Sequence, residues 1–292
     1  MKLDLSNRTI RQHERAISHN NFWRILGDMV IAFIVILVVD YLIDQLLGLT
    51  NPEGFTVRVG LAPVLDFIST LASSLFSMGI MWGLVDLTRQ GGPYDQGSLV
   101  KPYKEKLGRN ILALLLLSLI SFIPTFLVGI LSGLGLISAD ALSMDAWQVS
   151  ASFFAILVVA WIILSIILTW LDLSLALVAP LLGDHPDMGP WQVMKESFRL
   201  MKGNRWKLLG LILSYIWFPL LIIILGTVAF FYVAFFSSAQ GANIFLAISL
   251  FFFVLLIAAL LALYYGLRLN VARALFYTAL VDKDKATSCF PG

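Results

Sequence analysis

Acidic side chains inside long apolar stretches are the residues of this chain that could carry chemistry. Asp172 lies deepest, about ten residues from the C-terminal end of its stretch, which is about 15 Å along a helix. A carboxylate in hydrocarbon is costly, so it usually faces a bundle interior or a water-filled cavity. Two interpretations stay open for Asp172, a proton- or substrate-binding group and one half of a structural ion pair.

Arg268, near the end of the last apolar stretch, is the most suitable ionic partner for Asp172. Asn270 and Tyr265 lie close to it in sequence, so we predict an intramembrane polar cluster of Asp172, Arg268, Asn270 and Tyr265. A relay for protons or solutes would be expected to show several acids or histidines at one depth. A single acid beside a base is also explained by a bond that holds two helices in register.

Motifs of known enzymes are not found in the sequence. It has no glycine-rich phosphate loop, nucleophile elbow or paired cysteines. The run Asp184-His185-Pro186-Asp187 is better explained as a turn before a helix than as a metal site. Cys289 is the only cysteine, so no intrachain disulfide can form. We therefore expect a protein that is not an enzyme and that uses no metal and no cofactor.

The elements that must position these residues are apolar helices. The chain has 292 residues, of which 59% are hydrophobic and 13% are charged, whereas soluble domains carry about 25% charged residues. Each apolar stretch exceeds the roughly 20 residues that a helix needs to cross a bilayer. The sequence therefore predicts an all-α polytopic membrane protein with six transmembrane helices, over about 23–49, 63–88, 110–137, 148–182, 206–237 and 243–268.

Basic residues orient these spans. Every Lys and Arg except Arg58 lies in the N-terminal segment, in the second and fourth gaps, or in the C-terminal tail. Because cytoplasmic loops carry an excess of positive charge, we expect both termini in the cytoplasm and the spans in the plasma membrane. The predicted organisation is a cytoplasmic amphipathic segment 1–22, a membrane domain 23–280 and a cytoplasmic tail 281–292.

The same basic residues indicate the partners of the protein. Clusters of Lys and Arg at a membrane boundary favour contact with anionic lipid headgroups. No nucleic-acid-binding motif accompanies the charge, so nucleic acid is not an expected partner.

A short motif recurs where apolar stretches begin. Asn21–Gly27 and Asn204–Gly210 share the pattern Asn-x-Trp-basic-aliphatic-Leu-Gly, and Gly108–Leu112 is a weaker copy. Each copy opens a span from the basic side, which predicts three parallel helical hairpins. Pro124 and Pro219 follow inside the later spans and are the expected sites of kinks.

The segment 190–202 is predicted to form an interfacial helix. Pro190 suits the first turn and Gly203 suits the stop after the last. One face should carry Trp191, Met194, Phe198 and Met201, with charged residues largely opposite. Such a helix lies along the headgroup boundary with its aromatic side down, or docks a cytoplasmic partner.

This polar region also carries a resemblance to a known family. It contains Asp187-x-Gly189-x4-Met194-Lys195-Glu196-Ser197-x3-Met201-Lys202-Gly203-Asn204-Arg205-Trp206-Lys207-Leu208-Leu209. The pattern resembles the hallmark of an uncharacterised family of bacterial membrane proteins, that of domain of unknown function 975. Ala272–Tyr277 looks like the terminal aromatic pair of that family, although Tyr264-Tyr265-Gly266 stands where a Pro-Tyr pair is expected.

The resemblance implies a bacterial plasma-membrane protein and transfers no activity. A looser likeness extends to the membrane domain of some glycerophosphodiester phosphodiesterases, without the catalytic domain.

Two functions remain open at this point. The leading hypothesis is a non-enzymatic accessory or scaffold protein, or an envelope-stress and protection factor. It would act through its cytoplasmic face on a membrane-protein partner. The alternative is a small secondary transporter that uses Asp172, since transporters often combine repeated units with broken helices around a midplane site.

Overall fold

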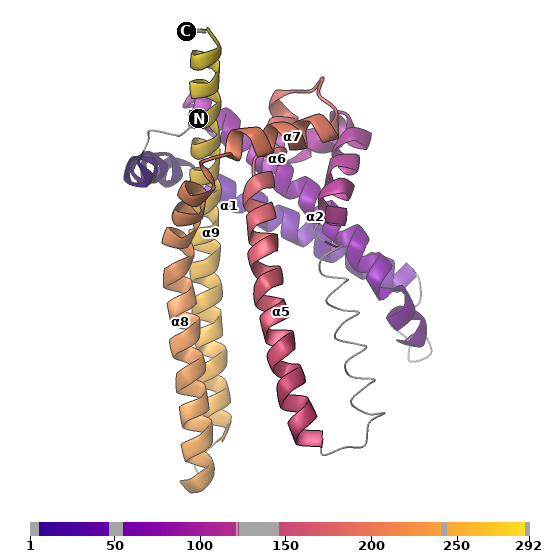
Figure 1. Cartoon of the computed structure of the whole chain (residues 1–292), viewed down its shortest axis with the longest axis vertical. Coiled ribbons are helices and arrows are strands. Elements are labelled where there is room, and N and C mark those ends of the chain that lie inside the picture. Colours follow the sequence, from indigo (N-terminus) through magenta and orange to yellow (C-terminus); the bar gives the residue numbers. More distant parts are fainter. Residues whose placement is uncertain (1–5, 47–54, 121, 123–145, 241–243, 290–292) are drawn as a thin grey trace. The chain divides into compact units, whose positions relative to one another are not determined.

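Helices form the regular structure of this chain. The computed structural model describes residues 6–46, 55–120, 122, 146–240 and 244–289, and these contain no strand. The all-α prediction is therefore confirmed (Figure 1). In chain order, the helices are α1 (Asn7–Leu46), α2 (Phe55–Gln90), the 3₁₀ helix η2 (Gln96–Val100), α3 (Lys101–Lys104), an unlabelled helix Leu107–Ile120, α5 (Ala146–Leu175), α6 (Val178–Asp184), α7 (Pro190–Met201), α8 (Arg205–Gln240) and α9 (Ile244–Cys289).

The chain is a multi-pass membrane protein. Within the described residues, five helices are long and apolar enough to cross a bilayer. A helix satisfies its own backbone hydrogen bonds in hydrocarbon. Most of the predicted third span, 110–137, and Pro124 within it, lie outside the described residues. The count of six spans therefore stays a prediction. The five segments are Asn7–Ile43, Phe67–Gln90, Val158–Asp184, Arg205–Phe230 and Phe251–Lys283.

The described residues fall into two compact units. The first draws on Met1–Val30, Ile80–Gln96 and Trp206–Gly292, and the second on Ile31–Gly79 and Gly97–Arg205.

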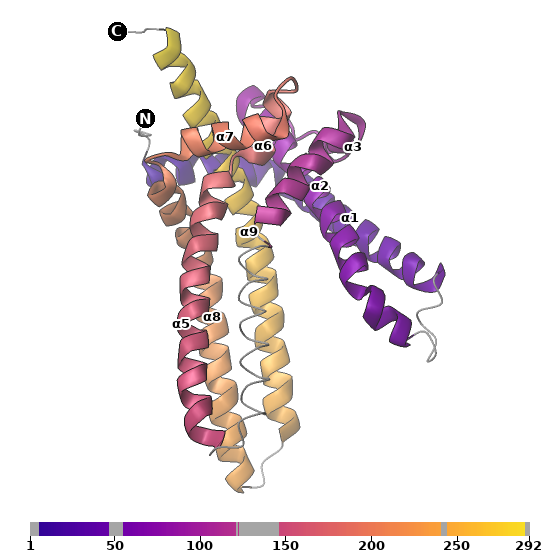
Figure 2. The ribbon, with the colours of Figure 1, turned by 45° about the vertical axis from the view of Figure 1, so that its right-hand side comes forward.

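In the first unit, α8 and α9 run side by side in opposite directions (Figures 1 and 2). Aromatic rings pack between them at two levels. The rings of Phe230 and Phe251 are 4.6 Å apart, and those of Phe218 and Tyr265 are 6.0 Å apart. The helix α8 continues through Pro219, and α9 extends beyond the predicted end at 280 to Cys289.

The N-terminal segment belongs to the same helix as the first span. The helix α1 runs through the predicted boundary between residues 22 and 23 without a break. One line of its side chains is buried at spacings of three and four, the period of a helix face. Unusually, most members of this line are polar: Ile10, Glu14, Ser18, Asn21, Ile25 and Asp28.

Two copies of the repeated motif show the same pattern of burial. Asn21 and Asn204 are buried, whereas the tryptophans two positions later, Trp23 and Trp206, are 79% and 82% exposed. The side-chain amide of each asparagine donates to a carbonyl four residues earlier on its own chain segment. In both copies the motif therefore places a buried amide beside an exposed indole. The arrangement of the chain as three hairpins stays a prediction.

In the second unit, α7 packs on α5 and α6 (Figure 2). It begins at the predicted residue 190 and ends at Met201, one residue before the predicted end at 202. At its start, the Gly189 N–H donates to Gln192 Oε1 at 3.1 Å, which is half of a capping box. At its end, Gly203 has a φ of 88°, a left-handed conformation that suits glycine. Ser197 Oγ on α7 donates to the Ser174 carbonyl of α5 at 2.8 Å.

A close approach in the second unit requires glycine at position 79. A Cβ atom on Gly79 would lie 2.5 Å from the Leu99 carbonyl oxygen of η2. Nearby, the Tyr103 hydroxyl donates to the Ala72 carbonyl of α2 at 3.1 Å, and burial raises the pKa of Tyr103 to about 12. The small residue in α2 thus allows contact with the 3₁₀ helix.

Candidate functional site

A buried ion pair in the first unit is the most highly organised polar site among the described residues. Glu14 of α1 is fully buried. Arg268 of α9 donates from Nε to Glu14 Oε1 at 2.8 Å and from Nη2 to Oε2 at 2.6 Å. The Tyr215 hydroxyl of α8 donates to Oε2 at 3.0 Å. Two parallel bonds from a guanidinium fix both the distance and the orientation of the carboxylate.

This network joins three helices of the unit. Glu14 comes from the N-terminal part of α1, Tyr215 from α8 and Arg268 from α9. A second contact, from Asn7 Nδ2 to the Lys207 carbonyl at 3.2 Å, joins α1 to the start of α8. Specific hydrogen bonds therefore fix the N-terminal part of α1 to α8 and α9. The amphipathic segment predicted for residues 1–22 would be held to the membrane only by its apolar face.

A cavity of about 540 Å³ lies beside the ion pair, between α1 and α9. Arg268 takes part in both features. Its Nε and Nη2 donate to Glu14, while Nη1 donates to the Tyr264 hydroxyl at 3.4 Å. The Tyr264 ring also lies 5.5 Å from the guanidinium carbon. The cavity is lined by Arg15, Ser18, His19, Phe22, Trp23, Tyr264 and Arg268.

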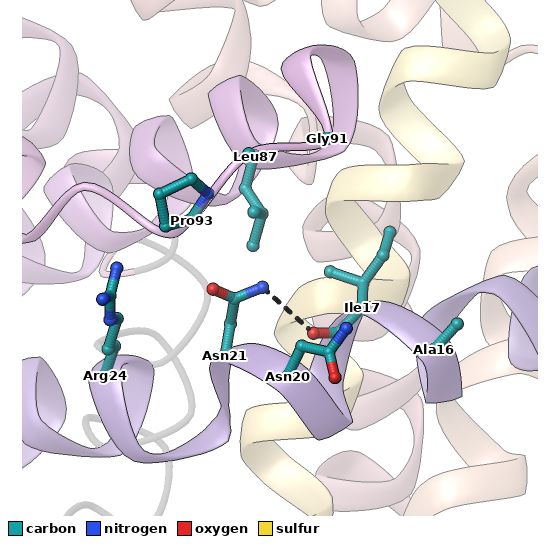
Figure 3. Close-up of a pocket in the computed structure, with 9 residues that line it drawn as sticks. Ala16, Ile17, Asn20, Asn21, Arg24, Leu87, Gly91 and Pro93 are labelled. Atoms are coloured by element: carbon teal, nitrogen blue, oxygen red, sulfur yellow. Dashed lines mark hydrogen bonds between the residues drawn. The ribbon is translucent and has the colours of Figure 1, made fainter.

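A second cavity, of about 550 Å³, lies on another side of α1. Figure 3 shows Asn21 and Arg24 directed from α1 toward Leu87 and Pro93. The amide of Asn21 is already occupied, because Nδ2 donates to the Ile17 carbonyl at 3.3 Å and Oδ1 accepts the Tyr94 N–H at 2.9 Å. The buried Asn21 side chain is therefore engaged with the backbone, and Arg24 is the charged residue of this lining.

In the second unit, Arg109 holds the chain that follows α6. Its Nη2 donates to the Leu182 carbonyl at 2.7 Å, and its Nη1 donates to the carbonyls of His185 and Pro186 at 2.9 and 2.7 Å. The last carbonyls of a helix lack partners within the helix, and a basic side chain can satisfy them. Asp184 ends α6, and the residues after it form a turn before α7, with the Met188 N–H donating to the His185 carbonyl.

The residues of the predicted intramembrane cluster are found in different surroundings. Arg268 has Glu14 as its carboxylate partner, and Tyr265 packs its ring on Phe218. Asn270 is half-buried. Asp172 has an exposed side chain on α5 in the second unit. The Asp172–Arg268 pair would join the two units, and it stays a prediction.

The predicted apolar face of α7 divides into two parts. Met194 and Met201 are buried within the protein, together with Val193 and Ser197. Trp191 is exposed, and Phe198 lies between, half-buried, with its ring 6.1 Å from that of Trp170. The methionines are buried because α5 and α6 pack on α7 and cover that side. Only Trp191 is left fully available to the headgroup region or to a partner.

Sequence reasoning did not identify Glu14 and Tyr215. Glu14 stands in a polar N-terminal segment, where a carboxylate is ordinarily solvated. A signal was nevertheless present. Ile10, Glu14, Ser18 and Asn21 continue, at helical spacing, the line of Ile25, and such continuity predicts a shared buried face.

Comparison with known proteins places this chain in a family. The family model described as "Protein of unknown function (DUF975)" matches residues 5–283, and the chain belongs to that family. No curated protein and no solved structure matches the chain. The looser likeness to the membrane domain of glycerophosphodiester phosphodiesterases stays a prediction.

Proposed function

We propose that this DUF975-family chain is a non-enzymatic accessory or scaffold protein of the bacterial plasma membrane. It crosses the membrane six times with both termini in the cytoplasm. It acts on a membrane-protein partner through its cytoplasmic face, as a structural or protective component of the envelope.

The distribution of buried polar side chains is the observation that supports this proposal. Each lies in or near the segments that carry Lys and Arg, and Ser174, the farthest, is bonded through its carbonyl to Ser197 of α7. Groups that bind a solute in a transporter would be expected near the middle of the spans. Among the residues whose burial the structure describes, the buried polar ones are Glu14, Ser18, Asn21, Asp28, Ser98, Asn110, Ser174, Ser197, Asn204 and Thr278.

The outward side of α7 is the contact surface we favour for the partner. Trp191, Lys195 and Arg199 are exposed and spaced one helical turn apart. Lys195 Nζ lies 5.9 Å from the centre of the Trp191 ring, so the cation and the indole form one patch. Trp and Arg are two of the residue types enriched at interaction hot spots.

Gentle purification from the native membrane, followed by mass spectrometry, tests the proposal. We expect a stoichiometric membrane-protein companion that is lost from the Trp191→Ala variant. Trp206→Ala is the control, because Trp206 is also an exposed indole but lies outside α7. Purification of the wild-type protein alone, or equal loss of the companion from both variants, would contradict the proposal.

The transporter alternative makes a different prediction for Asp172. If this residue carries transport, Asp172→Asn abolishes flux in proteoliposomes while the amount of folded protein stays unchanged. Under the accessory proposal, the wild-type protein shows no solute flux above that of empty vesicles.

A further inference from the structure

We propose that the cavity between α1 and α9 is a binding site for the phosphate of an anionic phospholipid headgroup. This inference stands beside the proposed function, because a lipid site would serve an accessory protein and a transporter equally.

The unused hydrogen-bond donors of the cavity are the first argument. Ser18 is 4% exposed, lines the cavity, and its hydroxyl has no hydrogen-bond partner within the part of the chain that the structure describes. Because Ser18 lines the cavity, a ligand or water there can supply the missing partner of this hydroxyl. Arg15 and His19 line the same cavity, and neither has an ionic or hydrogen-bonded partner among the described residues.

The charge of the cavity selects an anion. None of its lining residues is acidic. The carboxylate nearest to them, Glu14, is fully buried and already accepts bonds from Arg268 and Tyr215. The Glu14 charge therefore offsets that of Arg268, and Arg15 leaves the cavity with a net positive charge. The Nη1 edge of Arg268, which faces away from Glu14, adds a further donor.

The aromatic residues of the cavity indicate a lipid rather than a soluble anion. Trp23 and Tyr264 are both exposed, and both lie where their helices change from apolar to basic sequence. Trp and Tyr are enriched at the level of the headgroups, where an apolar ring and a polar edge are both satisfied. A phosphate between Arg15 and Arg268 would leave the glycerol and the acyl chains against Phe22, Trp23 and Tyr264.

The helical spacing of α1 keeps these groups together. Arg15, His19 and Trp23 succeed one another at four-residue intervals, as do Ser18 and Phe22, so they form one stripe along the helix. The ion pair of Glu14 with Arg268 holds this stripe against α9. The donors are therefore held in place before a ligand binds, which lowers the ordering cost of binding.

Native mass spectrometry of the delipidated full-length protein tests the site. Phosphatidylglycerol and phosphatidylcholine with identical acyl chains are titrated separately. The dissociation constant of the first bound lipid is measured for each. We expect the wild-type protein to bind phosphatidylglycerol about tenfold more tightly than phosphatidylcholine. The double variant Arg15→Gln with Ser18→Ala should lose this preference, because it lacks the charge-assisted hydrogen bond to the lipid. Both changes are small, and Arg15 is exposed.

Arg8→Gln is the matched control, because it removes the same charge from an exposed site on α1 that does not line the cavity. It should keep the preference within about twofold, since a distant exposed charge is screened. Equal affinity for the two lipids in the wild-type protein, or an equal loss in the Arg8→Gln variant, would overturn the proposal. Displacement of phosphatidylglycerol by inorganic phosphate or glycerol 1-phosphate at comparable concentration would also overturn it, in favour of a soluble phosphate ligand.

Discussion

Glu14 and Arg268 show how one buried pair can fix a terminal helix to a membrane bundle. A buried charge is tolerated when its partner and the remaining hydrogen bonds are in place. Here the carboxylate has two bonds from Arg268 and one from Tyr215. The pair need not add net stability relative to apolar residues of the same size. Its effect is to specify how α1 lies against α8 and α9.

Removal of one partner should therefore be far more harmful than removal of both. We predict that Arg268→Gln lowers the free energy of unfolding by about 3–5 kcal/mol, because Glu14 is left charged and unpaired. Replacement of both residues, Glu14→Gln with Arg268→Gln, should recover a large part of this loss. Thermal unfolding in detergent is measured for both single variants and the double variant. The three values give the coupling energy between the Glu14 and Arg268 side chains.

The exposed pair of Lys106 and Asp187 is the control for this experiment. Its nitrogen and oxygen are 3.5 Å apart, and the Asp187 side chain is 97% exposed. Asp187→Asn should leave the unfolding temperature nearly unchanged, because exposed ion pairs contribute little. Additive effects of the Glu14 and Arg268 substitutions would contradict the account of the buried pair.

The partner of Arg268 also marks where sequence reasoning stops. Hydropathy places Arg268 at a membrane boundary and makes an acid within a span the natural choice of partner. The structure pairs it with Glu14, 254 residues away in sequence. This contact depends on the packing of α1 against α9, and the tertiary arrangement of apolar helices is weakly encoded in a single sequence.

At the scale of the helices, Arg109 is the residue on which the turn after α6 depends. Three of its bonds end on backbone carbonyls between residues 182 and 186. We predict that Arg109→Gln destabilises this turn by about 1–3 kcal/mol, the cost of leaving such carbonyls without their donors. Limited proteolysis should then cut at residues 183–189 much faster than in the wild-type protein.

Lys106→Gln provides the comparison for that prediction. Lys106 also donates to the Pro186 carbonyl, but its side chain is half-exposed, and water can replace it. Its loss should change the rate of cleavage little. Equal rates for the Arg109→Gln variant and the wild-type protein would show that the turn does not depend on this side chain.

The contact between α2 and η2 depends on the absence of a side chain at Gly79. We predict that Gly79→Ala destabilises the protein by about 1–3 kcal/mol, because the new Cβ would overlap the Leu99 carbonyl. Gly266→Ala is the matched substitution in α9, where a Cβ would meet open space. It should be neutral or stabilise the helix by about 0.5–1 kcal/mol. Similar unfolding temperatures for the two variants would be evidence against the close approach.

The sequence predicts the existence of the helices well. Pro190 and Gly203 bound α7 almost to the residue, since both act through local backbone geometry. The side on which α7 is buried was harder to predict. Trp191 and Met194 share one hydrophobic stripe, but only Met194 is buried. Which part of a stripe faces protein depends on the neighbouring helices α5 and α6, and periodicity does not contain that information.

At the scale of the whole molecule, the distribution of charge predicts the orientation of the chain in the membrane. The polar network, the Arg109 contacts and α7 all lie in segments that also carry Lys and Arg. If cytoplasmic loops are the positive ones, all of these features face the cytoplasm. The proposed partner surface and the proposed lipid site both require that orientation. The account as a whole therefore depends on the membrane topology.

Labelling of single cysteines in cells measures this topology most directly. Cys289 is the only cysteine of the chain, so a membrane-impermeant maleimide reports on one position without further engineering. We predict that it labels Cys289 only after the membrane is opened, and that it labels Glu53→Cys in a Cys289→Ser protein while cells are intact. Labelling of Cys289 in intact cells, or protection of the cysteine at position 53, would contradict the account.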